Sequence, residues 1–227
     1  MNTIEVIVFA EGPSDEQFVK RVVAPRLHPQ HIFLKPRTLR TSREASGGAI
    51  NFDRLKFNVR NTVRQNPRTY LTTFFDLYAL DNGMPGKAAA AHLATPSSKA
   101  THIQNELHAA LVAHADCRPE RLLPYVQPYE LEGLFFSDLE QLASVERDWA
   151  QYLPALKAVR SAFDTPEHIN DGYATKPSSR LESMLAPRYR KTRHAPLIGE
   201  SIGLNRIVHE CPHFAAWIAR LQALQPL

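Results

Sequence analysis

Cysteine is scarce in this chain. Two cysteines, Cys117 and Cys211, occur among 227 residues, and no C-x-x-C pair is present. A fold held together by several disulfides is therefore excluded, and the chain is long enough to bury a core without them. Low cysteine content is typical of proteins in a reducing compartment, so we expect a cytoplasmic location.

Long hydrophobic runs are absent as well. The sequence has no stretch of about 18 apolar residues and no charged-then-apolar leader, which argues against transmembrane and secretory proteins. We therefore expect no membrane partner. The G-x-x-x-x-G-K-[ST] phosphate-binding motif is missing too, so we do not expect the chain to hydrolyse ATP by itself.

Positive charge is concentrated in one segment. The whole chain carries a net charge of +4, with 44 % hydrophobic and 22 % charged residues, which is typical of a globular protein. Residues 35–68 contain nine basic and two acidic side chains, a surplus of seven. Such a segment is either a phosphate-binding surface or a solvated basic face. In the first case, the residues predicted to contact DNA or RNA are Arg37, Arg40, Arg43, Lys56, Arg60 and Arg64.

Hydrophobic periodicity predicts alternating strands and helices in the first half of the chain. The expected strands lie at residues 4–10, 32–34, 70–78 and 123–126. An S-x-x-Q capping box at Ser14, an N-cap at Asn51 and a helix over 101–115 supply the intervening helices. From Tyr129 onward the pattern is helical. The breaks expected in this helical part lie at residues 165–177, 187–196 and 211–212.

This order of elements predicts an α/β fold with a short, mainly parallel sheet flanked by helices. Residues 1–140 are expected to form the α/β core, and residues 141–227 a helical C-terminal extension packed on it. The apolar residues that recur in the tail at helical spacing either pack on this core or form a partner surface. They are Ile202, Ile207, Phe214, Trp217 and Leu221.

Acidic residues follow the predicted strands. Glu11 comes directly after the first strand, Asp76 stands near the end of the strongest one, and Asp15 lies four residues after Glu11. Ligands bind at the carboxyl ends of strands in open parallel sheets, and carboxylates from several strand ends suit a hard divalent cation. Asp15 has a simpler alternative role, because an acid in the first turn of a helix favours the helix dipole.

A further acidic pair, Glu130 and Glu132, follows the last predicted strand. A spacing of two residues puts the two side chains on different faces of a helix. We therefore expect one of them to point into the site at the sheet edge. The apolar neighbours Leu131, Leu134 and Phe135 are expected to face the core.

Five short motifs together resemble a known bacterial family. EGPSDEQF follows the first strand, FFDLYAL ends the third, and QPYELEGLFFSD, KPSSRL and IGLNRIVHECPHFAAW come after them. In this order they are similar to Toprim-like proteins of unknown function, often encoded beside an AAA- or ABC-type ATPase in genome-defence settings. The resemblance spans residues 4 to 222. It implies an α/β domain that binds Mg²⁺ or Mn²⁺ for phosphoryl transfer, with an ATPase subunit as partner.

The resemblance also assigns roles to single residues. Glu11 matches the Toprim glutamate, Asp15 a second acid of related nucleases, and Asp76 the first aspartate of a D-x-D motif. The second position of that motif is Tyr78, which cannot replace a carboxylate as ligand of a hard cation.

Another acid must then complete the metal shell, or the metal is weak or absent. Glu132 is preferred for this place, and Glu130 and Asp81 are the alternatives. Cationic partners for a scissile phosphate are Lys176, Arg180 and Lys191, and the resemblance places Ser178 and Arg180 near the site. Alternatively, Arg180 only belongs to a surface helix that begins at Pro177.

The sequence thus favours a metal-dependent nuclease that serves as effector of an ATPase-coupled defence system. The expected catalytic residues are Glu11, Asp76, Glu132 and Arg180, and the expected metal ligands are Glu11, Asp15, Asp76, Glu130 and Glu132. The alternative is an inactive Toprim-like module that binds nucleic acid or a partner protein. The H-E-x-x-H pattern at residues 209–213 predicts no zinc site, because Pro212 interrupts the helical turn that both histidines would need.

Overall fold

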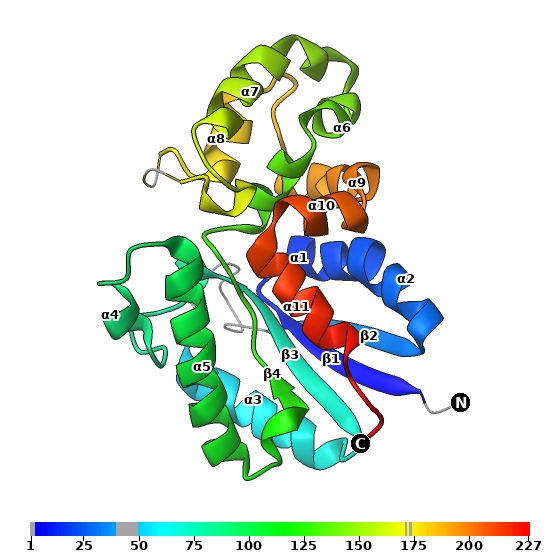
Figure 1. Cartoon of the computed structure of the whole chain (residues 1–227), viewed down its shortest axis with the longest axis vertical. Coiled ribbons are helices and arrows are strands. Elements are labelled where there is room, and N and C mark those ends of the chain that lie inside the picture. Colours follow the sequence, from blue (N-terminus) through cyan, green and yellow to red (C-terminus); the bar gives the residue numbers. More distant parts are fainter. Residues whose placement is uncertain (1–2, 40–49, 171, 173) are drawn as a thin grey trace.

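A sheet of parallel strands forms the centre of the fold (Figure 1). The computed structural model describes residues 3–39, 50–170, 172 and 174–227. The strands of this described part are β1 (Ile4–Ala10), β2 (Ile32–Thr38), β3 (Thr69–Asp76), β4 (Leu122–Leu123) and β5 (Val126–Gln127). They lie in the order β2-β1-β3-β4, with β5 paired to the end of β3, and every pair is parallel. The predicted fold class is confirmed.

Both faces of the sheet are buried, because the side chains of a strand alternate between them. Val6 and Val8 of β1 belong to one hydrophobic cluster, and Ile7 and Phe9 belong to another on the opposite face. The near-continuous apolar run of β1 is therefore the pattern of a strand covered on both sides.

Helices from the first half of the chain supply part of each cover. They are α1 (Pro13–Phe18), α2 (Ala24–Leu27), α3 (Phe52–Gln65), α4 (Lys87–Ala90) and α5 (Pro96–Ala115). A π-helical turn at Val19–Val23 joins α1 to α2. α3 and α5 cover the face of Ile7 and Phe9, whereas the segment from α1 to α2 covers the other face (Figure 1).

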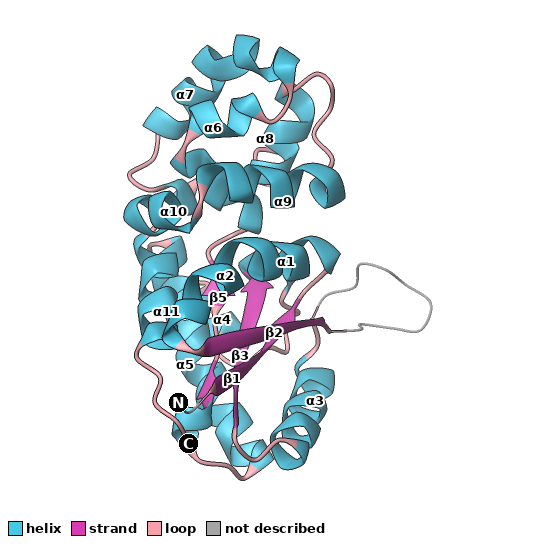
Figure 2. Cartoon of the chain, turned by 90° about the vertical axis from the view of Figure 1, so that its right-hand side faces the viewer, coloured by secondary structure: helices cyan, strands magenta, loops and turns pink. Residues whose placement is uncertain are grey.

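Helices from the second half complete the molecule. They are α6 (Leu139–Ser144), α7 (Leu153–Ser161), α8 (Pro177–Met184), α9 (Lys191–Ile202), α10 (Leu204–Glu210) and α11 (Pro212–Gln222). Figure 2 shows α6 to α10 stacked above the sheet, while α11 returns to the sheet itself. The indole nitrogen of Trp217 in α11 donates to Thr72 Oγ1 at 3.0 Å, and its ring stacks on Tyr125. One hydrophobic cluster consequently includes residues from Ile4 to Leu221.

The start of α1 differs from the predicted capping box at Ser14. The helix begins at Pro13, and the backbone N–H of its N-cap residue, Gly12, donates to Asp15 Oδ2 at 3.2 Å. Asp15 therefore closes the first turn, which is the helix-dipole role that the sequence left open for it.

Other boundaries also differ from the prediction. β3 ends at Asp76, because residues Leu77–Ala79 form a 3₁₀ turn. α5 begins at Pro96 rather than at residue 101, since Thr95 caps it by accepting from Ser98 N. α9 runs through Pro196, where a break was expected. Its first turn closes upstream of that proline, through a 2.8 Å hydrogen bond from His194 N to the carbonyl oxygen of Arg190.

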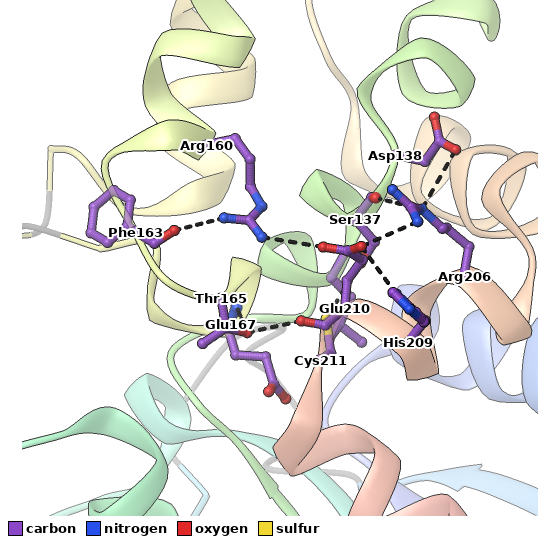
Figure 3. Close-up of polar contacts among 11 residues, drawn as sticks. Ser137, Asp138, Arg160, Phe163, Thr165, Glu167, Arg206, His209, Glu210 and Cys211 are labelled. Carbon is purple, nitrogen blue, oxygen red and sulfur yellow. Dashed lines mark hydrogen bonds and ion pairs between the residues drawn. The ribbon is translucent and has the colours of Figure 1, made fainter.

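The carboxylate of Glu210, at the end of α10, forms ion pairs with two arginines (Figure 3). Arg160 Nη2 of α7 and Arg206 Nη1 of α10 each lie 3.2 Å from its carboxylate. Pro212 begins α11, and the ring of His213 is turned to the sheet, with Nε2 3.0 Å from Val126 O. Glu210 and His213 thus stabilise the junction of helices, and Pro212 interrupts the helical turn between the two histidines, as expected.

Candidate functional site

Acidic side chains meet at the carboxyl edge of the sheet. Glu11 follows β1 directly, and Asp76 is the last residue of β3. The backbone N–H of Asp76 donates to the carboxylate of Glu11, so the two strand ends are in contact. Asp76 Oδ1 in turn accepts from Leu131 N at 2.9 Å, which brings the 3₁₀ segment Leu131–Ser137 and its Glu132 to the same edge.

Lys191, the first residue of α9, provides the cation of this group. Its Nζ lies 3.4 Å from Glu132 Oε2 and 3.8 Å from Asp76 Oδ2. Removal from water alone would lower the pKa of Lys191, but Glu132, Asp15, Asp76 and Glu11 together raise it well above its ordinary value. We call these four acids with Lys191 the acid cluster.

The acids of the cluster hold their protons more tightly than free carboxylates do. Burial, followed by the charge of Asp15, raises the pKa of Glu11 from 4.5 to about 7. Burial also raises the pKa values of Asp15, Asp76 and Glu132. Because a single ammonium faces four carboxyl groups, the site favours either protons or a further cation.

Several oxygens of the cluster lack hydrogen-bond partners. Among the described residues, Glu11 Oε2, Asp15 Oδ1 and Glu132 Oε2 are buried and accept no hydrogen bond, although Glu132 Oε2 lies 3.4 Å from Lys191 Nζ. Buried acceptors without partners cost free energy, so they are atoms that a bound cation would stabilise. Carboxylate oxygens are the donors that Mg²⁺ and Mn²⁺ prefer, and the donor chemistry therefore fits such an ion.

The side chains do not stand in a finished metal-binding geometry. Among the described residues, no group of three or more histidine, cysteine, aspartate or glutamate side chains is arranged to hold a metal ion. Lys191 stands against Asp76 and Glu132 instead. A divalent cation at this place would have to share or replace the contacts that Lys191 makes.

Glu130 borders the cluster but has its own partners. Its Oε1 accepts from Lys176 Nζ at 2.6 Å, and its Oε2 accepts from Ser178 N at 3.1 Å. Glu130 and Glu132 are both buried, but their side chains have different partners, in keeping with their spacing of two residues. Glu132 faces Lys191, whereas Glu130 anchors the start of α8.

Arg180 and Tyr78 lie apart from the cluster's contacts. Arg180 Nε donates to the carbonyl oxygen of Thr175, so the guanidinium stabilises the loop before α8, which begins at Pro177 as one alternative held. Tyr78 lies in the 3₁₀ turn after β3, where its ring stacks on Tyr129.

Asp81, the other alternative for the metal shell, lies in the loop after β3 and contacts the start of α3. Its Oδ2 accepts from Asn51 Nδ2 at 2.8 Å, and Asn51 is the N-cap of α3, as predicted. Sequence reasoning missed Tyr189, whose hydroxyl donates to Glu132 Oε1 at 3.1 Å. A buried tyrosine needs a partner for its hydroxyl, but the sequence carries no signal that names this one.

A comparison with models of protein families assigns the chain to a family. A family model described as a domain of unknown function (DUF4276) matches residues 10–222. The chain belongs to this family. No curated protein and no solved structure matches it. The region matched by the DUF4276 family contains the whole acid cluster. Within the described residues, no helix combines the length and apolar character that crossing a membrane requires.

The basic segment forms a face along α3. The helix carries a basic residue every four positions: Lys56, Arg60 and Arg64. The pKa of His114 on α5 is lowered, first by removal of its ring from water and then by the positive charge of these three residues. Arg60 Nε is buried without a hydrogen-bond partner, and Lys56 pairs with Asp53 at 2.6 Å. We call Lys56, Arg60 and Arg64 the basic face.

The predicted loop arginines need one correction. Arg37 lies in the edge strand β2, paired in register with Phe9, and therefore on the sheet side that α3 covers. Arg40 and Arg43 lie outside the described residues. An open pocket of ≈ 440 Å³ at the far end of α3 is lined by Arg64, Arg68 and Arg118, among others. It continues the basic face away from the acid cluster.

The apolar stripe of the tail is not a free surface. Ile202, Ile207, Phe214, Trp217 and Leu221 are all buried in the hydrophobic cluster that they share with the sheet. The interpretation of these residues as a partner-binding surface is therefore wrong, and their alternative role in the chain's own core is confirmed.

Proposed function

We propose that this chain is a metal-dependent phosphodiesterase acting on nucleic acid, with Mg²⁺ or Mn²⁺ bound by the acid cluster. The observation that carries the proposal is the imbalance of the cluster. Four carboxyl groups face one lysine, and three of their buried oxygens lack hydrogen-bond partners. A divalent cation would neutralise this surplus and satisfy those atoms.

Each residue of the cluster has its own part in the reaction. Glu11, Asp15, Asp76 and Glu132 would hold the ion through their carboxylate oxygens. When bound, the ion would stabilise the charge that develops on the attacking and leaving oxygens of a phosphodiester. Tyr189 fixes the orientation of Glu132 through its 3.1 Å hydrogen bond. Lys191 is placed to stabilise the negative charge of a phosphate brought to the cluster.

The basic face supports nucleic acid as the substrate. α3 begins beside Asp81 and ends at the basic pocket, so its cations line one side of the sheet. Such a surface attracts a polyphosphate backbone and holds it without regard to sequence. The likeness to Toprim proteins adds a family-level analogy, which raises the expectation of phosphoryl transfer and matches Glu11, Asp15 and Asp76 to acids of that superfamily.

A second candidate function is a module that binds nucleic acid or a partner without cleaving it. Lys191 favours this alternative, since it already supplies a cation to Asp76 and Glu132. Tyr78 favours it as well, because a tyrosine stands where the D-x-D motif has its second acid.

Calorimetric titration with Mn²⁺, paired with a cleavage assay on DNA, total RNA and tRNA, separates the two functions. We expect wild type to bind Mn²⁺ and cleave, and Glu11→Gln and Asp76→Asn to lose both. Glu16→Gln is the matched control, because Glu16 lies on α1 beside Asp15 but accepts hydrogen bonds from Thr38. If wild type binds Mn²⁺ but cleaves no substrate, the binding module is the remaining function. If wild type and Glu11→Gln give equal heats of Mn²⁺ binding, the proposed metal site is wrong.

We also propose an ATPase subunit as partner. The chain lacks a P-loop, and an unrestrained nuclease would damage its own cell, so a separate nucleotide-driven subunit is the natural restraint. Co-expression with the product of the neighbouring gene, followed by size-exclusion chromatography with and without ATP, tests this. Separate elution under both conditions, together with full cleavage by the chain alone, would contradict the proposal.

A further inference from the structure

A pair of tyrosine rings stands next to the acid cluster. The rings of Tyr78 and Tyr129 are stacked, with centroids 5.5 Å apart and an angle of 27° between their planes. Tyr78 is two residues beyond Asp76, and Tyr129 directly precedes Glu130. The hydrogen bond from Leu131 N to Asp76 Oδ1 holds these two segments together. A separation of two residues spans at most about 7 Å between Cα atoms, so the turn that carries Tyr78 directly adjoins the strand end that carries Asp76.

The two rings are layered from the core outward. Tyr129 is partly buried and packs against the hydrophobic cluster under α3 and α5. Tyr78 lies outside it and remains 43 % exposed, so its ring is accessible from solvent. Tyr129 also has a φ of 61°, in the left-handed region that non-glycine residues seldom adopt. Strain of this kind tends to occur where a side chain is held for function.

The turn that carries Tyr78 is fixed in place. The ammonium of Lys87 donates to the carbonyl oxygens of Leu77 at 2.8 Å and Leu80 at 3.0 Å, on either side of the tyrosine. Ile50 N donates to Ala79 O at 2.6 Å, and the side-chain amide of Asn170 donates to the Tyr78 hydroxyl. Little motion therefore remains to be lost when another ring stacks on Tyr78.

We propose that Tyr78, supported by Tyr129, is a stacking platform for an unpaired nucleobase, so that the substrate class is single-stranded nucleic acid. The proposal rests on the proposed function and names its substrate. Exposed aromatic rings are a usual means of holding single strands, because every base has a flat face to stack. In a duplex both faces of a base are already stacked, and the platform would stay empty.

A tryptophan placed at position 78 reports the stacking directly. The native tryptophans, Trp149 and Trp217, are 0 % and 2 % exposed, so added ligand should not reach them. In Tyr78→Trp we expect a single-stranded oligothymidylate of about twelve nucleotides to quench the fluorescence in EDTA, where no cleavage occurs. The same strand with abasic sugars and a duplex of equal length should leave the signal unchanged. Quenching by the abasic strand, or none by oligothymidylate, would overturn the platform.

Affinity measurements give a second readout. Tyr78→Ala should weaken binding of oligothymidylate roughly fivefold to a hundredfold and leave the abasic strand unaffected. Tyr78→Phe, which keeps the ring, should bind like wild type. Phe33→Ala is the matched control, because Phe33 is a similarly exposed ring, 37 %, that stacks on His28 away from the cluster. Equal affinities for wild type and Tyr78→Ala would reject the proposal. These measurements need no metal, so they remain valid if the chain proves not to be a nuclease. If the chain cleaves nucleic acid but no base stacks on Tyr78, only the platform is rejected.

Discussion

The carboxyl of Glu11 binds a proton up to nearly neutral pH. Burial and the neighbouring Asp15 raise its pKa from 4.5 to about 7. A protonated carboxyl cannot ligate a metal ion, so the affinity for Mn²⁺ should rise as the pH increases from about 6 to about 8, and binding should release protons. Calorimetry in two buffers of different ionisation enthalpy measures that release. Binding that is independent of pH, with no proton released, would exclude Glu11 as a ligand.

Glu167 should make the stability of the fold depend on pH. It accepts from His213 N at 2.9 Å and Phe214 N at 2.8 Å at the start of α11, yet burial raises its pKa from 4.5 to about 7. Between these values the folded chain keeps a proton that the unfolded chain has lost. The stability that the protonated Glu167 contributes to the fold is therefore fully present below pH 4.5 and is lost as the pH rises through about 7.

The variant Glu167→Gln isolates this effect. The amide loses one acceptor at every pH, but it does not titrate. As the pH rises from 4.5 to about 7, wild type should lose stability and the variant should not. The difference in the free energy of unfolding, variant minus wild type, should therefore increase by a few kcal/mol, at about 1.4 kcal/mol per pKa unit. Burial lowers the pKa of His213 to about 4, so this residue makes the free energy of unfolding increase with pH. That effect is the same in wild type and in the variant and cancels in the difference. Denaturant titrations across this range measure the difference, and parallel curves would refute the prediction.

Single residues of the site were predictable to different degrees. Glu11 and Asp76 could be found because each follows an apolar strand, and strand ends of a parallel sheet share an edge. Lys191 was named only as one of three candidate cations, because its place beside Asp76 depends on how α9 packs. Tyr189 was not found, since its contact with Glu132 joins residues 57 positions apart.

At the scale of elements, the close packing of α1 on α9 positions the acid cluster. A Cβ on Gly199 of α9 would lie 2.9 Å from carbon atoms of both Phe18 and Val22. Gly199→Ala should therefore push α9 away and destabilise the fold by about 1–3 kcal/mol, as measured by denaturant unfolding. Leu197→Ala, at an exposed position of the same helix, should change stability little. Equal stability of Gly199→Ala and wild type would disprove the close contact.

The basic face of α3 makes a prediction about salt. If Arg60 and Arg64 bind phosphates, the charge reversals Arg60→Glu and Arg64→Glu should weaken binding of DNA or RNA. They should also flatten its salt dependence, by roughly one unit of slope for each phosphate that the variant no longer binds. Arg147→Glu, an exposed arginine at the start of the 3₁₀ segment Arg147–Tyr152, is the control. Unaltered slopes in the reversed variants would mean a merely solvated face.

Element boundaries were less predictable than element types. The apolar stripe of α3 and the near-continuous apolar run of β1 identified both elements, because each pattern reflects direct burial. The end of β3 and the continuation of α9 through Pro196 were missed. Both depend on contacts made elsewhere: the turn after β3 is held by Lys87, and the first turn of α9 forms before the proline.

At the scale of the whole molecule, the helical extension is part of the sheet's cover. α11 packs Trp217 against Thr72 and Phe74, so a fragment of residues 1–140 would expose that face of the sheet. We expect the fragment to aggregate or to lack a cooperative unfolding transition. Circular dichroism with thermal melting measures this, with the full chain as reference. A soluble fragment with a sharp transition would establish residues 1–140 as an independent domain.

The chain's architecture followed from its sequence more readily than its site did. Alternating strand and helix patterns limit the topology to a covered parallel sheet. The helices after residue 140 showed amphipathic stripes but not their partners, because stripes alone do not say which surface covers them. Packing of the extension on the core was predicted, but the structure was needed to show that α11 is the helix that returns to the sheet.

The position of the tail also determines when the chain can fold. The hydroxyl of Tyr70, at the start of β3, donates at 2.6 Å to the carbonyl oxygen of Gln225, 155 residues further along. During translation β1 to β3 leave the ribosome well before α11, which covers one face of them. Contacts between such distant segments also form slowly. That face of the sheet consequently stays uncovered until α11 has emerged, and its apolar side chains are exposed for that time.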